Sequence, residues 1–184
     1  DSSMNKRIAI FCGSSMGVDP IYKACAQEVG RKLVAHKYDL VYGGGSVGLM
    51  GVVADEVLSL KGQVTGVITE KLHAWEVGHA GLTQLHIVNT MHERKALMAQ
   101  LSDGFIALPG GIGTLEEITE VYTWLQLGYH HKPCSFLNVA GYYDAFIALL
   151  DQMVTQGFLD AKSRNLIIIE SNIDDLLAKM SLNN

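Results

Sequence analysis

The chain has 184 residues, of which 48% are hydrophobic and 18% charged, an ordinary composition for a compact α/β domain. Its 14 basic and 19 acidic residues give a net charge of −5, so there is no broad positive field for nucleic acid or anionic lipid. No apolar run approaches the roughly 20 residues that span a bilayer. Three cysteines without C-x-x-C spacing indicate a reducing compartment. We therefore expect a cytoplasmic protein that binds neither nucleic acid nor membrane.

One domain covering residues 1–184 is expected, because no repeat, linker or low-complexity segment divides the chain. Residues 1–3, ahead of Met4, lack the basic and apolar regions of a signal peptide. We interpret them as a remnant of cloning.

Short β-branched runs alternate with longer helical patterns, which predicts a parallel sheet with helices on both faces. The expected strands are residues 7–12, 39–42, 64–68, 85–88, 105–108, 135–139 and 166–169. The expected helices are one that begins at Asp19-Pro20 and then residues 49–60, 93–101, 114–127, 143–156 and 174–180. Gly62 and Gly157 follow two of these helices, where left-handed caps are expected. The predicted fold class is α/β, a Rossmann-like three-layer domain with a parallel sheet of about seven strands.

Three glycine-containing segments follow three of the expected strands: 12–17 (CGSSMG), 43–51 (GGGSVGLMG) and 109–117 (PGGIGTLEE). Because ligands of such sheets bind outside the carboxyl ends of the strands, we expect the three segments to converge on one site. Glycine loops ahead of a helix commonly bind anions through free backbone N–H groups and the helix dipole. A pocket for a phosphorylated ligand is indicated.

Gly43, Gly45 and Gly48 also match G-x-G-x-x-G, the pattern of dinucleotide-binding loops. An NAD-dependent oxidoreductase, with Glu70 as its ribose-binding acid, is therefore an alternative. The pattern follows the second strand instead of the first, and a second glycine loop competes for the phosphate, so this alternative is disfavoured. A Walker A loop is excluded because no G-K-[ST] occurs. A purely structural alternative is that the glycines of these loops only allow tight turns beneath helices.

Two cations, Arg94 and Lys95, lie where the fourth strand leads into the next helix. Cations at a helix start oppose the helix dipole, which disfavours a simple solvated cluster. Contacts from Arg94 and Lys95 to a phosphate or a base are favoured instead.

Glu116 and Glu117 follow the third glycine loop, in what we expect to be the first turn of a helix. Acids there stabilise a helix dipole by about 0.3–1 kcal/mol, but beside a bound phosphate they are unfavourable unless positive charge lies between. Arg94 supplies a permanent positive charge. A sugar that becomes oxocarbenium-like as its glycosidic bond breaks supplies another. The residues therefore predict removal of the base from a nucleoside 5′-monophosphate.

The same segments closely resemble the LOG (Lonely Guy) family of cytokinin riboside 5′-monophosphate phosphoribohydrolases. The resemblance covers nearly the whole chain, through CGSS at 12–15, GGGSVGLMG at 43–51, MHERK at 91–95, PGGIGTLEE at 109–117, ITEVYTWLQLGYHHKP at 118–133 and LNVAGYYD at 137–144. It implies hydrolysis of N6-modified or plain AMP to a free cytokinin base or adenine and ribose 5-phosphate, with no cofactor and no metal. The label lysine decarboxylase, which the family has often carried, lacks support because no lysine motif for pyridoxal phosphate occurs.

Carried over by position, the resemblance implies that Arg94 and Glu117 are catalytic. Glu117 would stabilise the oxocarbenium ion and activate water, and Arg94 would support the leaving base. The other implied substrate-binding residues are Ser14, Gly45, Glu76, Met91, Lys95, Gly110, Gly111, Ile112, Gly113, Thr114, Glu116 and Thr123. Ile112 replaces the tyrosine common in plant members, which leaves open the preference between isoprenylated and plain bases.

The resemblance also implies a homodimer, with residues 122–129 as a candidate partner surface. Core packing of Trp124 and Leu125 is an equal alternative for that segment. His130 and His131 lack a third ligand at a recognised spacing, so no metal site is expected. The main alternative to an enzyme is a nucleotide or cofactor carrier on the same fold, and the paired Arg94 and Glu117 favour the enzyme.

Overall fold

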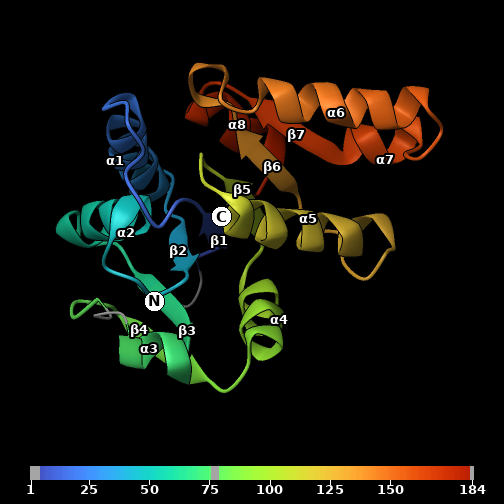
Figure 1. The fold of residues 1–184 in the computed structure, drawn as a ribbon. Coiled ribbons are helices and arrows are strands. Elements are labelled where there is room, and N and C mark those ends of the chain that lie inside the picture. The colour runs from blue at the N-terminus through green and yellow to red at the C-terminus, as the bar shows by residue number, and fades with distance from the viewer. Residues whose placement is uncertain (1–4, 76–78, 183–184) are drawn as a thin grey trace.

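The structure, a computed structural model, describes residues 5–75 and 79–182. These residues form one parallel sheet of seven strands in the order β4-β3-β2-β1-β5-β6-β7, with helices on both faces (Figure 1). The strands are β1 Arg7–Phe11, β2 Asp39–Tyr42, β3 Val64–Thr69, β4 Gln84–Val88, β5 Gly104–Ala107, β6 Cys134–Leu137 and β7 Ile167–Glu170. The predicted α/β Rossmann-like class is confirmed.

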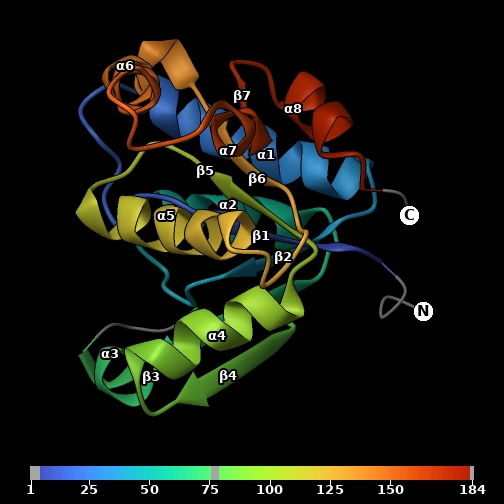
Figure 2. The ribbon, with the colours of Figure 1, turned by 90° about the vertical axis from the view of Figure 1, so that its right-hand side faces the viewer.

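The helices cover the sheet in two layers. They are α1 Ile21–Ala35, α2 Gly48–Ser59, α3 Glu70–Trp75, α4 Met91–Leu101, α5 Ile112–Gln126, α6 Asp144–Thr155, α7 Ala161–Leu166 and α8 Ile173–Met180, with a 3₁₀ turn at Val139–Gly141. Helices α1, α2 and α8 pack on one face, and α4, α5 and α6 pack on the other (Figure 2). Among the described residues no helix is both long and apolar enough to cross a membrane.

Strand β1 lies at the centre of the sheet and contributes side chains to the hydrophobic cores on both of its faces. Its side chains alternate between faces, as in any strand. Ile8 and Ile10 join the core beneath α1 and α2, while Ala9 and Phe11 join the core beneath α4 and α5. All four are almost completely buried. A strand buried on both faces is largely apolar, as β1 is from Ile8 to Phe11, and this property made the strand recognisable in the sequence.

The strand order places a ligand crevice between β1 and β5. From β1 the chain adds strands toward one edge as far as β4, and from β5 it adds them toward the other edge. The carboxyl ends of β1 and β5 therefore flank the switch point, where open α/β sheets bind ligands. The backbone N–H of Gly13 donates to the carbonyl of Pro109 (3.0 Å), and the N–H of Leu49 donates to the carbonyl of Gly13 (3.1 Å). The predicted convergence of the three glycine segments is thus confirmed.

Most of the predicted helix ends differ from the structure by one or two residues. Helix α1 begins at Ile21, with Pro20 as its N-cap residue, although a carboxylate oxygen of Asp19 accepts from the N–H of Ile21 (2.9 Å). Gly157 has the predicted left-handed conformation, with φ of 83°. The prediction for Gly62 is wrong, because the left-handed residue after α2 is Lys61, with φ of 65°. A Cβ on Gly62 would lie 2.7 Å from Cγ1 of Val57, so close packing explains this glycine.

The sequence did not predict α3 and α7. Each has six residues, which is too short to show a helical repeat of apolar positions. Helix α7 begins at an Asp160 cap whose carboxylate accepts from the N–H of Ser163 (2.6 Å). Both helices lie outside the segments that form the candidate site.

Candidate active site

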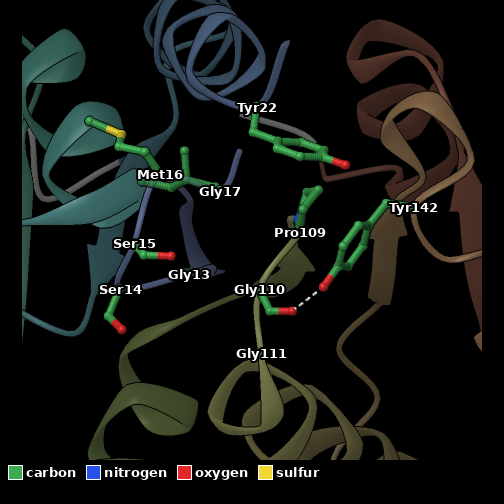
Figure 3. A pocket seen from close by; sticks show the side chains of 11 residues that line it. Gly13, Ser14, Ser15, Met16, Gly17, Tyr22, Pro109, Gly110, Gly111 and Tyr142 are labelled. Carbon is green, nitrogen blue, oxygen red and sulfur yellow. Dashed lines mark hydrogen bonds between the residues drawn. The ribbon is translucent and has the colours of Figure 1, made fainter. Parts of the chain in front are cut away.

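Two neighbouring pockets lie at the switch point. The first, of about 260 Å³ and here named the Arg94 pocket, is lined by Cys12, Gly13, Ser14, Met50, Arg94, Gly111, Ile112, Gly113, Thr114 and Glu117. The second, of about 330 Å³ and here named the tyrosine pocket, is lined by Gly13–Gly17, Tyr22, Leu49, Pro109, Gly110, Gly111 and Tyr142 (Figure 3). The described lining of the tyrosine pocket includes no charged side chain. The smaller pocket is therefore the candidate for charged chemistry.

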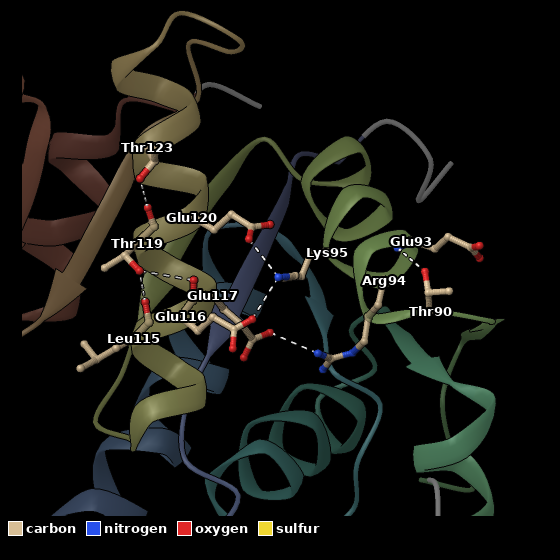
Figure 4. A network of polar contacts seen from close by, with 10 residues as sticks. All are labelled: Thr90, Glu93, Arg94, Lys95, Leu115, Glu116, Glu117, Thr119, Glu120 and Thr123. Carbon is tan, nitrogen blue, oxygen red and sulfur yellow. Dashed lines mark hydrogen bonds and ion pairs between the residues drawn. The ribbon is translucent and has the colours of Figure 1, made fainter.

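Arg94 is a buried cation in the wall of its pocket. Only 7% of the residue is exposed. Its Nε donates to the carbonyl of Val67 on β3 (2.9 Å), and its Nη1 lies 3.5 Å from Oε2 of Glu117 (Figure 4). A Cβ on Gly43, after β2, would overlap Nη2 of Arg94. A glycine at position 43 is therefore what allows the guanidinium to lie against this backbone.

Helix α4 positions Arg94 through a cap that the sequence analysis missed. Oγ1 of Thr90 accepts from the N–H of Glu93 (3.1 Å), and a carboxylate oxygen of Glu93 accepts from the N–H of Asn89 (3.1 Å). This reciprocal pair is close to a capping box, which T-x-x-E at residues 90–93 would have indicated. The cap fixes the first turn, and Arg94 follows it directly.

Glu117 faces Arg94 from α5. The prediction that Glu116 and Glu117 occupy the first turn is wrong, because α5 begins at Ile112 and both glutamates lie in its second turn. The glycine loop itself supplies the first helical residues, and this moves the carboxylates further along the helix. Burial raises the pKa of Glu117, while the neighbouring Arg94 cation opposes that rise. The carboxylate is thus desolvated and charge-compensated at once.

A second charged cluster joins α4 to α5 beside the pocket. Nζ of Lys95 lies 3.0 Å from Oε1 of Glu116 and 2.9 Å from Oε2 of Glu120 (Figure 4). These hydrogen bonds raise the pKa of Lys95 above its ordinary value. The sequence analysis missed Glu120, although its i,i+4 spacing from Glu116 places both on one helix face. Lys95 and Glu116 contact each other, and their predicted contacts with substrate stay predictions.

The loop before α5 offers backbone donors to the Arg94 pocket. The first bond of the helical ladder runs from the N–H of Leu115 to the carbonyl of Gly111 (3.2 Å), so the N–H groups ahead of Leu115 lie outside that ladder. A Cβ on Gly111 or Gly113 would meet no described atom within 4 Å. Gly110 differs, because a Cβ there would overlap the side chain of Thr114. Open space over two glycines at a helix N-terminus suits a ligand that approaches the backbone closely.

The remaining predicted residues divide into two groups. Ser14, Ile112 and Thr114 line the Arg94 pocket, with Ile112 largely exposed and Thr114 buried. The other group does not line this pocket. Gly110 lies in the wall of the tyrosine pocket, and the carbonyl of Gly45 accepts a hydrogen bond from the hydroxyl of Tyr42. Met91 is half-exposed at the start of α4, and Thr123 lies in a shallow hollow on α5. Glu76 lies outside the described residues.

Cys12 is a pocket residue that the sequence analysis did not assign. Burial raises the pKa of its thiol, and the nearby Glu117 carboxylate raises that pKa further. The thiol is thus neutral, a poor nucleophile, and part of the apolar wall behind Glu117. Over the described part of the chain, no three His, Cys, Asp or Glu side chains are grouped so that they could hold a metal ion.

Comparisons with known proteins identify the family. A family model described as "Possible lysine decarboxylase" matches residues 50–180. The chain is 49% identical over 175 residues to the probable cytokinin riboside 5′-monophosphate phosphoribohydrolase LOGL9 of Oryza sativa subsp. japonica, covering 95% of this chain and 77% of the relative. It is 46% identical over 175 residues to the cytokinin riboside 5′-monophosphate phosphoribohydrolase LOG1 of Arabidopsis thaliana, covering 95% and 82%.

Solved structures share the fold at lower sequence identity. A molybdenum cofactor binding protein from Rippkaea orientalis superposes with a TM-score of 0.70 at 20% identity, covering 96% of this chain and 95% of that one. The Moco carrier protein of Chlamydomonas reinhardtii gives a TM-score of 0.67 at 19% identity, covering 95% and 99%. The fold therefore occurs in proteins named for different functions, and the close sequence relatives decide the family. The chain belongs to the LOG family of phosphoribohydrolases.

Proposed function

We propose that this protein hydrolyses the N-glycosidic bond of adenosine 5′-monophosphates, including N6-modified ones, to a free base and ribose 5-phosphate. The observation that carries the proposal is the pair of Arg94 and Glu117, 3.5 Å apart in the wall of a pocket that ends at the N-terminus of α5. The names of relatives 46–49% identical to the chain support the same reaction.

The phosphate is assigned to the N-terminus of α5. Free N–H groups and the positive end of the helix dipole favour an anion there, and Gly111 and Gly113 leave the space open. Glu117 lies four residues beyond Gly113, a rise of about 6 Å along the helix. A ribose that bridges this interval brings its anomeric carbon toward the Glu117 carboxylate.

Glu117 then acts on the sugar side of the breaking bond, and Arg94 acts on the base side. The bond from C1′ to the base nitrogen breaks, and its electron pair leaves with the base, so positive charge develops on the sugar beside the Glu117 carboxylate. The oxygen of a water molecule bonds to C1′ as Glu117 accepts one of its protons. Arg94 stabilises the departing base and keeps Glu117 in place. The base takes up a proton from solvent and Glu117 returns its proton to solvent, so the balance is nucleotide plus water to base plus ribose 5-phosphate.

The surroundings of Lys95 also argue against the label lysine decarboxylase. A catalytic lysine that forms a Schiff base needs a neutral amine. Lys95 lies between Glu116 and Glu120, and both contacts raise its pKa, so it remains protonated. It is suited to joining α4 and α5 or contacting an anion.

The dinucleotide alternative loses its main support. Gly43 makes room for Arg94, and a Cβ on Gly48 would overlap the backbone of Ser14. Close packing within the protein therefore accounts for two of the three glycines of the fingerprint. A pyrophosphate group is not needed to explain them.

The test is incubation of the protein with AMP and with isopentenyladenosine monophosphate, followed by chromatography for free base and ribose 5-phosphate. Release of both products supports the proposal. Binding of the nucleotide without release of base would support the carrier instead, and binding of NAD(P)H in a fluorescence titration would support the oxidoreductase. Comparing the two nucleotides also decides the base preference that Ile112 leaves open.

We also propose a cytoplasmic homodimer. Within residues 122–129, Tyr122 is a core residue whose hydroxyl donates to the carbonyl of Ser163 (2.8 Å), whereas Leu127 and Tyr129 are largely exposed. These two exposed side chains are the candidates for partner contact. Light scattering that gives the monomer mass would contradict the dimer.

A further inference from the structure

The segment from Leu108 to Gly110 presents three consecutive carbonyl groups, and each accepts a hydrogen bond from a different residue. The hydroxyl of Tyr143 donates to the carbonyl of Leu108, and the N–H of Gly13 donates to that of Pro109 (3.0 Å). The hydroxyl of Tyr142 donates to the carbonyl of Gly110 (Figure 3). The acceptor side of this loop is therefore fully engaged by protein donors.

The bond from Tyr142 determines where the next N–H points. The carbonyl of Gly110 and the N–H of Gly111 belong to one planar trans peptide unit, so they point in opposite directions. Tyr142 lies on one side of the loop, and Ser14 lies on the other (Figure 3). Holding the carbonyl toward Tyr142 therefore aims the N–H of Gly111 toward the side of Ser14, which lines the Arg94 pocket. Gly110 has no side chain of its own to set this orientation.

Tyr142 is itself well supported. It follows a turn with two left-handed residues, Ala140 (φ of 48°) and Gly141 (φ of 74°). Its ring packs edge-on against Tyr143, at 4.9 Å between ring centroids, and against Tyr22 at 5.8 Å. The buried Tyr143 fixes the backbone, and the half-exposed Tyr142 extends its hydroxyl to the loop.

We propose that Tyr142 is a positioning residue for phosphate binding: its hydroxyl orients the peptide between Gly110 and Gly111 so that the N–H of Gly111 donates a hydrogen bond to the phosphate of the nucleotide. This rests on the proposed function, which assigns the phosphate to this loop. Tyr142 lines the tyrosine pocket and is not among the residues that line the Arg94 pocket, so its effect should fall on binding of the phosphorylated ligand and not on bond cleavage.

The test compares Tyr142→Phe with Tyr22→Phe, a matched control that removes a hydroxyl from the neighbouring ring of the same pocket. Tyr142→Phe should raise KM for AMP roughly tenfold and change kcat by less than about twofold, because one hydrogen bond that positions a binding group is lost. It should weaken binding of ribose 5-phosphate, measured by calorimetry, by a similar factor. Tyr22→Phe should change neither quantity. Thermal unfolding of both variants checks that the fold is retained.

Each result decides the proposal. An unchanged KM and unchanged ribose 5-phosphate affinity in Tyr142→Phe would overturn it, and so would equal effects of the two variants. A fall in kcat and melting temperature without a change in affinity would show a merely structural role and also overturn it. If the wild type cleaves no nucleotide, the proposed function fails while the calorimetric comparison still tests Tyr142. A wild type that neither cleaves AMP nor binds ribose 5-phosphate would overturn both.

Discussion

The guanidinium of Arg94 lies against the backbone of Gly43, where there is no room for a side chain: a Cβ at position 43 would overlap Nη2 of Arg94. Gly43→Ala should therefore displace Arg94 from Glu117 and lower kcat/KM by roughly 10- to 100-fold, the usual scale for a catalytic group that is misplaced. Steady-state kinetics with AMP measures the effect. Kinetics like those of the wild type, in a variant that melts at the same temperature, would show that Arg94 does not need this space.

Gly113 is the opposite case, because a Cβ there meets no described atom within 4 Å although the residue lies in the first turn of α5. Alanine favours a helix over glycine by up to about 1 kcal/mol, so Gly113→Ala should leave the melting temperature unchanged or raise it. The added methyl group should nevertheless weaken the binding of ribose 5-phosphate, since it enters the space assigned to the phosphate. Calorimetry with ribose 5-phosphate and thermal unfolding give the two readouts. A stabilised variant with unchanged affinity would place the phosphate elsewhere.

Arg94 contacts two groups at once, the carbonyl of Val67 and the carboxylate of Glu117. Arg94→Lys keeps the charge but cannot make both contacts, because an ammonium group lacks the planar fork of a guanidinium. We expect kcat/KM for AMP to fall by roughly 10²-fold. The measurement is steady-state kinetics, with circular dichroism as the check on folding. Activity retained in this variant would mean that charge alone matters at position 94.

Burial raises the pKa of Glu117, and kinetics can test whether this pKa is indeed above the ordinary value of a glutamate. The mechanism needs the carboxylate, so activity is lost as the pH falls through that pKa. Because the pKa is raised, the loss should begin at a higher pH than for an ordinary glutamate, whose pKa is about 4.3. The acid limb of the kcat/KM profile, measured where the protein remains folded, reports this value in the free enzyme. An acid limb at or below the ordinary glutamate value would be inconsistent with a desolvated Glu117.

The sequence predicted the sheet well because its central strands are buried on both faces and so consist largely of apolar residues, as Ile8 to Phe11 of β1 do. It also predicted that Arg94 and Glu117 belong to one site, since both follow strands that end at the same sheet edge. The structure brings them within 3.5 Å.

The individual hydrogen-bond partners of residues far apart in the chain could not be predicted in this way. The hydroxyl of Tyr142 donates to a carbonyl 32 residues away, and Lys95 contacts a glutamate 25 residues away. No local spacing encodes either contact. The position of Glu117 within its helix was also mispredicted. Ile112 and Gly113 have weak helix propensities but are helical here, so Glu117 lies in the second turn of α5.

The account depends most on the charge of Glu117, and turnover of AMP by Glu117→Gln beside the wild type tests it most directly. The substitution preserves the shape of the side chain and removes the negative charge that would face the anomeric carbon. We predict that kcat falls by roughly 10²–10⁴-fold while ribose 5-phosphate still binds. A variant that releases adenine at nearly the wild-type rate would contradict the mechanism.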